Sequence, residues 1–63
     1  KAEDLSKVRM IITVLFTYFT EHPEKLPEEL ASMRGEFSDE ELAKDHVAGM
    51  TDRYAVNLYE KLF

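Results

Sequence analysis

The chain has 63 residues, enough for one small domain, and a domain of this size buries only about 60% of the surface that its unfolded form exposes. It contains no cysteine, which excludes disulfide bonds and cysteine-ligated zinc, so a partner or a longer parent chain is the expected source of additional stability. The net charge of −5 disfavours direct binding to nucleic acid or to an anionic membrane surface.

The sequence shows no segment typical of export or membrane insertion. Its longest run without charged residues, 10–20, is far shorter than the ~20 apolar residues that cross a bilayer. Glu3 and Asp4 near the start are unlike the basic beginning of a signal peptide. We therefore expect a cytoplasmic protein without membrane contact. Because the first residue is not Met, we also expect a processed chain or a piece of a larger one.

The first predicted element is a long apolar helix from about Asp4 to Glu21. Apolar residues recur there at spacings of three and four, as in the core stripe of a helix: Leu5, Val8, Ile12, Leu15 and Phe19. Five further positions are also apolar: Met10, Ile11, Val14, Phe16 and Tyr18. A helix that is apolar around most of its circumference is normally buried on several sides. The remaining residues offer too few other elements to cover it, which predicts that the chain works inside something larger.

A short second helix is expected between two breaks in the chain. Pro23 ends the first helix, because the residue before a proline is disfavoured in the helical region. Pro27 suits the first turn of the short helix, where Glu28 and Glu29 face the positive end of the helix dipole. Gly35 is expected just beyond the C-terminal end of this helix.

A long C-terminal helix completes the predicted all-α fold, a small bundle that packs on itself or against partner chains. Ser38 and Glu41 have the spacing of a capping box at its start. Apolar residues stay in helical phase across Gly49: Ala43, Val47, Met50, Tyr54, Leu58 and Leu62. We expect one helix, bent at Gly49. The alternative is a break there, with Thr51 capping a new helix.

Small and acidic residues of this helix form a candidate site. On an unbroken helix Asp45 and Asp52 would lie two turns apart on one face, with the small residues Ala48 and Gly49 between them. Such a strip lets another backbone or a ligand approach closely. Two interpretations remain open: the wall of a binding site, or a helix-packing groove flanked by solvated acids.

Three neighbouring side chains have both a functional and a structural interpretation. Arg53 could bind a phosphate or a carboxylate through its bidentate guanidinium, or form an internal ion pair. Tyr54 fits a core or rim aromatic better than a base-stacking platform. His46 has no second histidine at metal-binding spacing, so we interpret it as a surface or packing residue. With no nucleophile–base pair and no multi-ligand cluster, we predict no catalytic residue and no metal ligand in this chain.

The run 45–55, with its core Ala-Gly-Met-Thr-Asp-Arg, changes this weighing. It closely resembles the C-terminal end of the bacterial deoxyguanosinetriphosphate triphosphohydrolase-like proteins of the HD superfamily. The Leu-Pro-Glu-Glu segment at 26–29 fits the same family. One departure is visible, since His46 and Val47 stand where the family usually has Tyr-Ile.

The resemblance implies that residues 1–63 are one helical module, the C-terminal part of a larger HD-type phosphohydrolase. Its parent would hydrolyse a dNTP to a deoxynucleoside and triphosphate, with Mg or Mn bound by upstream histidines and aspartates that this segment lacks. The segment alone should therefore be inactive and carry no cofactor. Expected partners are the upstream catalytic domain, further copies of the parent and, through the parent, the dNTP.

The residues that would contact substrate or an interface are those nearest the signature: Asp45, Gly49, Asp52, Arg53 and Tyr54. Two alternatives stay open. One is a self-contained helical module for protein–protein interaction, without a catalytic role. The other is an acidic regulatory domain.

Overall fold

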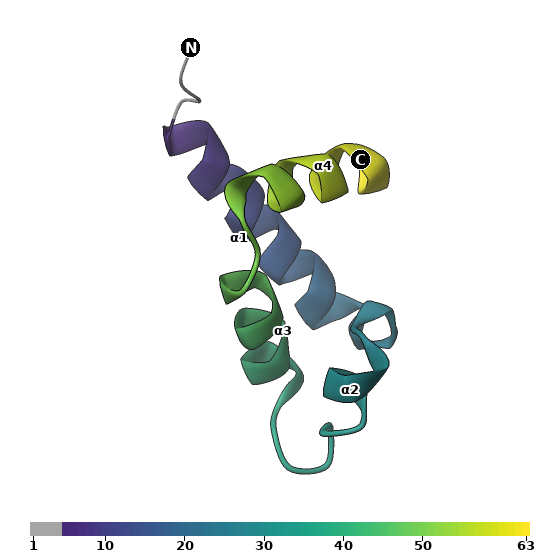
Figure 1. Ribbon diagram of the computed structural model, residues 1–63. Helices are drawn as coiled ribbons and strands as arrows, with labels where there is room; N and C mark the ends of the chain where they lie inside the picture. The colour runs from purple at the N-terminus through teal and green to yellow at the C-terminus, as the bar shows by residue number, and fades with distance from the viewer. Residues whose placement is uncertain (1–4) are drawn as a thin grey trace.

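The computed structural model describes residues 5–63, and all regular structure within them is helical (Figure 1). The elements in chain order are α1 (Leu5–Glu21), a 3-10 helix η1 (Pro23–Lys25), α2 (Glu28–Ala31), α3 (Asp39–Ala48) and α4 (Asp52–Leu62). This confirms the all-α class for the described part of the chain. No helix in it is long and apolar enough to cross a membrane.

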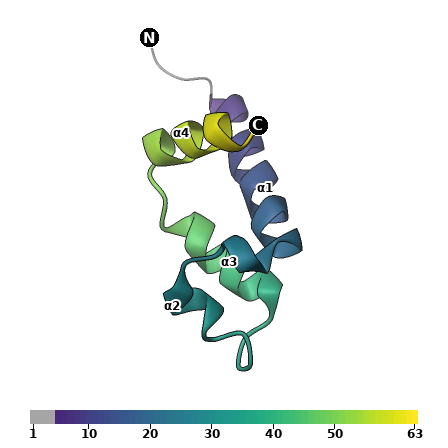
Figure 2. The same cartoon turned by 90° about the vertical axis from the view of Figure 1, so that its right-hand side faces the viewer.

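Helix α1 is the central helix of an elongated molecule that measures 43 × 18 × 17 Å. Figures 1 and 2 show α3 beside α1 and α4 crossing α1 nearer its N-terminal end, while η1 and α2 lie beyond its C-terminal end. Helices α3 and α4 both pack on α1. The core therefore forms around α1, and α2 contributes little to it.

The core contains only apolar side chains within the described residues: Val8, Ile11, Leu15, Phe19, Leu26, Leu42, Ala43, Val47 and Ala55. The stripe on α1 differs from the predicted one in that Ile11 is buried and Ile12 only half-buried. Asp4 and the side chain of Leu5 lie outside the described part of the chain.

The expected surplus of apolar surface on the first helix is smaller than predicted. Ile12, Val14 and Phe16 are half-buried, because α3 and α4 approach α1 from two sides and cover a wide face. The large hydrophobic side chains that are exposed lie mostly elsewhere: Met10, Met33, Phe37, Tyr54, Leu62 and Phe63. Only Met10 belongs to α1, so most of the apolar circumference of this helix is covered by the other helices of residues 5–63.

The segment that follows α1 starts at the predicted break before Pro23, but its short helix ends earlier than predicted. Helix α1 stops at Glu21, directly before the non-helical residue that precedes Pro23. Pro27 is the N-cap of α2 rather than part of its first turn, and α2 ends at Ala31, well before Gly35. Tighter i to i−3 turns follow, with the Met33 amide 2.9 Å from the Leu30 carbonyl. Since no described glycine has a positive φ, Gly35 is not a left-handed helix cap.

The capping box at the start of α3 is confirmed. The Glu41 amide donates to the Ser38 hydroxyl at 3.1 Å, and the Ser38 amide donates to the Glu41 carboxylate at 3.0 Å. Both bonds satisfy donors that the first turn of a helix leaves unpaired. They fix the residue at which α3 begins.

The expectation of one long C-terminal helix is wrong, and the alternative of a break is confirmed. Helix α3 ends at Ala48, with Gly49 as its C-cap, and α4 begins after Thr51. The Thr51 hydroxyl accepts the Tyr54 amide at 3.1 Å. A glycine inside a helix costs about 1 kcal/mol relative to alanine, and a threonine N-cap contributes about 1 kcal/mol relative to alanine. Both effects favour two helices over one, and the break lets α4 cross α1.

The break also resets which side of the last helix faces the core. Ala55 is fully buried, whereas Tyr54, predicted to be in phase with the core, is 53% exposed. Asp45 and Asp52 now belong to different helices. The single face on which they were expected together does not exist.

Candidate functional site

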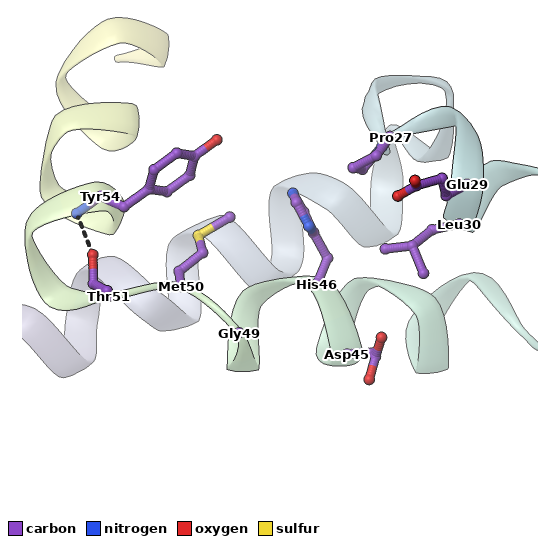
Figure 3. A pocket seen from close by; sticks show the side chains of 9 residues that line it. All are labelled: Pro27, Glu29, Leu30, Asp45, His46, Gly49, Met50, Thr51 and Tyr54. Carbon is purple, nitrogen blue, oxygen red and sulfur yellow. Dashed lines mark hydrogen bonds between the residues drawn. The ribbon is translucent and has the colours of Figure 1, made fainter.

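An open groove of about 550 Å³ lies between α2 on one side and the junction of α3 with α4 on the other (Figure 3). Its lining consists of Pro27, Glu29, Leu30, Asp45, His46, Gly49, Met50, Thr51 and Tyr54. Figure 3 shows Pro27, Glu29 and Leu30 reaching towards His46 from the opposite wall. The groove therefore joins residues that are more than twenty positions apart in the sequence.

His46 occupies the middle of this groove. Its ring meets the ring of Phe19 edge-on, with the centroids 4.9 Å apart, so it packs on the core and also faces the groove. Burial lowers the pKa of His46 below its ordinary value, and the nearby charge of Asp45 opposes that shift only in part. Burial therefore favours the neutral form of the imidazole. It acts as a packing residue, in agreement with the structural interpretation of the sequence.

The break between α3 and α4 determines the position of one wall of the groove, formed by Met50, Thr51 and Tyr54. Because Thr51 caps α4 through the Tyr54 amide, the Tyr54 ring projects over the groove beside Met50 (Figure 3). Met50 is half-buried and Tyr54 is exposed. The capping interaction thus turns a tyrosine outward that would otherwise have followed the core phase.

The structure brings together three of the five predicted site residues. Asp45, Gly49 and Tyr54 line the groove, whereas Asp52 and Arg53 lie in a separate cleft of about 360 Å³ along α4. The other two residues of that cleft are Val56 and Asn57. The predicted arrangement of both aspartates around one small-residue strip is therefore wrong, because the helix breaks between them.

Gly49 has open space around it within this chain. A Cβ at this position would meet only its own helix, with the His46 and Asp45 carbonyl oxygens at 3.7 and 3.9 Å, which are ordinary contacts. No other element of residues 5–63 approaches it. If Gly49 allows another group to pack closely against the backbone, that group comes from outside residues 5–63.

Arg53 is exposed and forms no ion pair with any residue in the range 5–63. The predicted internal pairs with Asp45, Asp52 or Glu60 are therefore not observed. Its guanidinium is available to an anionic group of another molecule or domain.

A second cleft, of about 350 Å³, extends the groove along α3. It is lined by Leu30, Met33, Phe37, Glu41, Leu42 and Asp45. Neither Met33 nor Phe37 was singled out from the sequence. Their signal was the presence of two large apolar residues beside Gly35, in a stretch too polar and too short to bury them.

Within residues 5–63, no three histidine, aspartate or glutamate side chains come close enough together to hold a metal ion. The described residues thus offer an apolar groove, a separate arginine and no cluster for metal-dependent chemistry. Fold and site together define a small all-helical module with an open groove on its surface.

The comparison with known families names this module. Residues 2–61 match the phosphohydrolase-associated domain, and the chain belongs to this family. The resemblance seen in the run 45–55 is thereby confirmed.

Similar proteins carry the name deoxyguanosinetriphosphate triphosphohydrolase-like protein. The relative from Leptospira interrogans is 44% identical over 64 residues, covering 95% of this chain and 17% of the relative. The relative from Nitrosomonas europaea is 43% identical over 58 residues, covering 92% of this chain and 15% of the relative. The relative from Caldanaerobacter subterraneus is 33% identical over 60 residues, covering 95% of this chain and 18% of the relative. The chain thus spans about a sixth of the length of these relatives, and no solved structure matches it.

Proposed function

We propose that this domain is the C-terminal accessory segment of a larger dNTP triphosphohydrolase of the HD superfamily. The parent would convert dGTP or another dNTP and water into a deoxynucleoside and triphosphate. The observation that carries the proposal is the 44% identity over 95% of this chain to a relative named as triphosphohydrolase-like. The chain's own contribution would be to support the fold, the subunit contacts or the nucleotide site.

The chemical step belongs, in this proposal, to an upstream catalytic domain. A bound Mg or Mn ion supplies Lewis-acid chemistry, which activates water and polarises phosphate oxygens. The described residues of this domain do not fit such an ion, since they contain no cluster of three metal-binding side chains. Their part is contact, through the groove beside His46 and through the cleft that contains Arg53.

Arg53 and Asp52 are proposed to serve the parent across an interface. Arg53 is exposed without an ion partner in residues 5–63, which supports a role towards a nucleotide phosphate or a carboxylate of the catalytic domain. Asp52 neighbours it in the same cleft and would orient it. Gly49 and Tyr54 would meet the catalytic domain in the groove.

We further propose that the parent is cytoplasmic and forms homo-oligomers. Phe63, at 65% exposure, and Leu62 leave apolar surface at the end of α4, which supports association.

The proposal is tested on the full polypeptide that contains these residues. The purified polypeptide should release triphosphate when it is incubated with Mn²⁺ and each of the four dNTPs. Deletion of this domain should abolish triphosphate release or make the remaining polypeptide insoluble. Failure of the intact polypeptide to hydrolyse any dNTP would overturn the proposed activity.

The second candidate function is a self-contained helical interaction module. The exposed apolar groove favours it as much as it favours the first. The sequence of the parent gene distinguishes the two candidate functions. Upstream His and His-Asp motifs would support the phosphohydrolase, and their absence would support the interaction module.

A further inference from the structure

The groove beside His46, of about 550 Å³, and the cleft along α3, of about 350 Å³, are adjacent parts of one surface, since Leu30 and Asp45 line both of them. We call this surface the α2–α3 groove. Its apolar side chains are Pro27, Leu30, Met33, Phe37, Leu42, Met50 and Tyr54.

The α2–α3 groove contains half of the large hydrophobic side chains that the described chain exposes. Met33 is 40% exposed, Phe37 46% and Tyr54 53%. The core does not need them, since it closes around α1 without them. Contiguous exposed apolar surface of this kind marks an interaction site.

The charged lining of the groove has a single sign. Glu29, Glu41 and Asp45 are its charged residues, and no Lys or Arg lines either opening. His46 adds no positive charge at pH 7, because burial lowers its pKa. The rim therefore favours an occupant with positive charge.

A second copy of this domain fits that requirement poorly. Two chains that each carry a net charge of −5 would bring acidic rims and acidic bodies together. Like charges across an interface cost affinity. The remainder of the same polypeptide is a better source, since the matched segment makes up only 17% of the Leptospira relative.

We propose that the α2–α3 groove binds a basic amphipathic segment, with apolar residues flanked by Lys or Arg, that belongs to the same polypeptide outside these 63 residues. The source of the segment rests on the proposed function, in which this domain is part of a larger enzyme. Apolar side chains of the segment cover Met33, Phe37 and Tyr54, while its cations meet Glu29, Glu41 and Asp45.

The methionines of this domain report whether the groove is covered. Met10 and Met33 have similar exposure, 48% and 40%, but only Met33 lies in the groove. In the full polypeptide, a peroxide pulse read by mass spectrometry should oxidise Met33 at least about tenfold more slowly than in denaturant, since oxidation follows exposure. Met10 is the internal comparison. Oxidation of Met33 within about twofold of its denatured rate would show an open groove and overturn the proposal.

The charge requirement has a matched pair of variants. Glu28 and Glu29 are both exposed and both lie in the first turn of α2, but only Glu29 lines the groove. Reversal of either charge has the same effect on the helix dipole. Glu29→Lys should expose Met33 to peroxide in the full polypeptide, and Glu28→Lys should not. Equal protection of Met33 in both variants would contradict a basic occupant.

Dilution identifies the source of the segment. A tethered segment acts at an effective concentration in the millimolar range, so Met33 protection should be the same at about 10 µM and about 0.1 µM polypeptide. Protection lost on dilution would assign the groove to a second copy or a separate partner and overturn the proposal.

A dNTP assay on the same preparation keeps this inference apart from the proposed function. Protected Met33 without turnover would reject the activity alone, and turnover with freely oxidised Met33 would reject the occupied groove alone.

Discussion

The two long sides of this domain differ in how completely their apolar residues are covered. Where α3 and α4 pack on α1, Leu15 and Ala55 are fully buried and the core is closed. Along α2 and the turn after it, Met33 and Phe37 remain exposed although the chain has apolar partners nearby. The closed core thus lies around α1, and the exposed apolar side chains of the α2 side lie outside it.

The sharpest test of this difference is a truncation in the closed side. Leu15→Ala removes a fully buried side chain and should lower the free energy of unfolding by about 2–5 kcal/mol. Urea denaturation of the isolated domain, followed by circular dichroism, measures the change. Met10→Ala is the control, because Met10 is exposed and should shift the midpoint little. Equal losses in the two variants would contradict the burial of Leu15 in the core and the exposure of Met10.

A substitution at Gly49 tests whether another domain covers the groove in the full polypeptide. Within this domain a side chain at Gly49 meets no other element, so Gly49→Leu should be tolerated by the isolated domain. In the full polypeptide, a catalytic domain packed against the same position would make it cost about 1–3 kcal/mol. The difference between the two melting temperature shifts is the measurement. An increase in the parent's melting temperature would show that this face is open to solvent.

Arg53→Lys tests the separate cleft on α4. Lysine keeps the charge but loses the planar fork that binds phosphate or carboxylate through two bonds. We expect kcat/KM of the full polypeptide to fall at least tenfold, about 1.4 kcal/mol of transition-state stabilisation, with little change in melting temperature. Kinetics within twofold of the unsubstituted enzyme would reduce Arg53 to a surface charge and remove it from the proposed site.

The smallest expected effect is a pH dependence from His46. Its pKa is lowered in the folded state, so folding disfavours its protonation. The stability it contributes is present above the ordinary value of about 6.5 and is lost as pH falls through the lower, folded pKa. Unfolding free energy should therefore decline below about pH 6.5, and His46→Gln should flatten part of that decline. The exposed His22 provides the control substitution. A decline unchanged by His46→Gln would assign it to other groups.

Features that depend on neighbouring residues were predictable from the sequence. The capping box of Ser38 and Glu41 and the end of α1 before Pro23 both follow from local geometry, and both are present. The break at Gly49 was harder to predict, because apolar residues keep helical phase across it while the glycine and the Thr51 cap favour two helices. Gly35 was expected to cap α2, but the chain leaves the helix at Ser32 through tighter turns.

The groove could not be predicted, because it depends on packing between distant segments. Leu30 and Tyr54 are 24 positions apart and line one opening only after α2 has packed beside α3 and α4 has crossed α1. The helix break then determined which predicted site residues met. It kept Asp45 and Tyr54 together and separated both from Arg53.

The central claim is that this domain assists a triphosphohydrolase without performing the chemistry. Isolated domain and full polypeptide should be incubated side by side with dGTP and Mn²⁺, and triphosphate release compared with a metal-only control. The account predicts release by the full polypeptide and none by the isolated domain. Turnover of dGTP by the isolated domain above that control would contradict it.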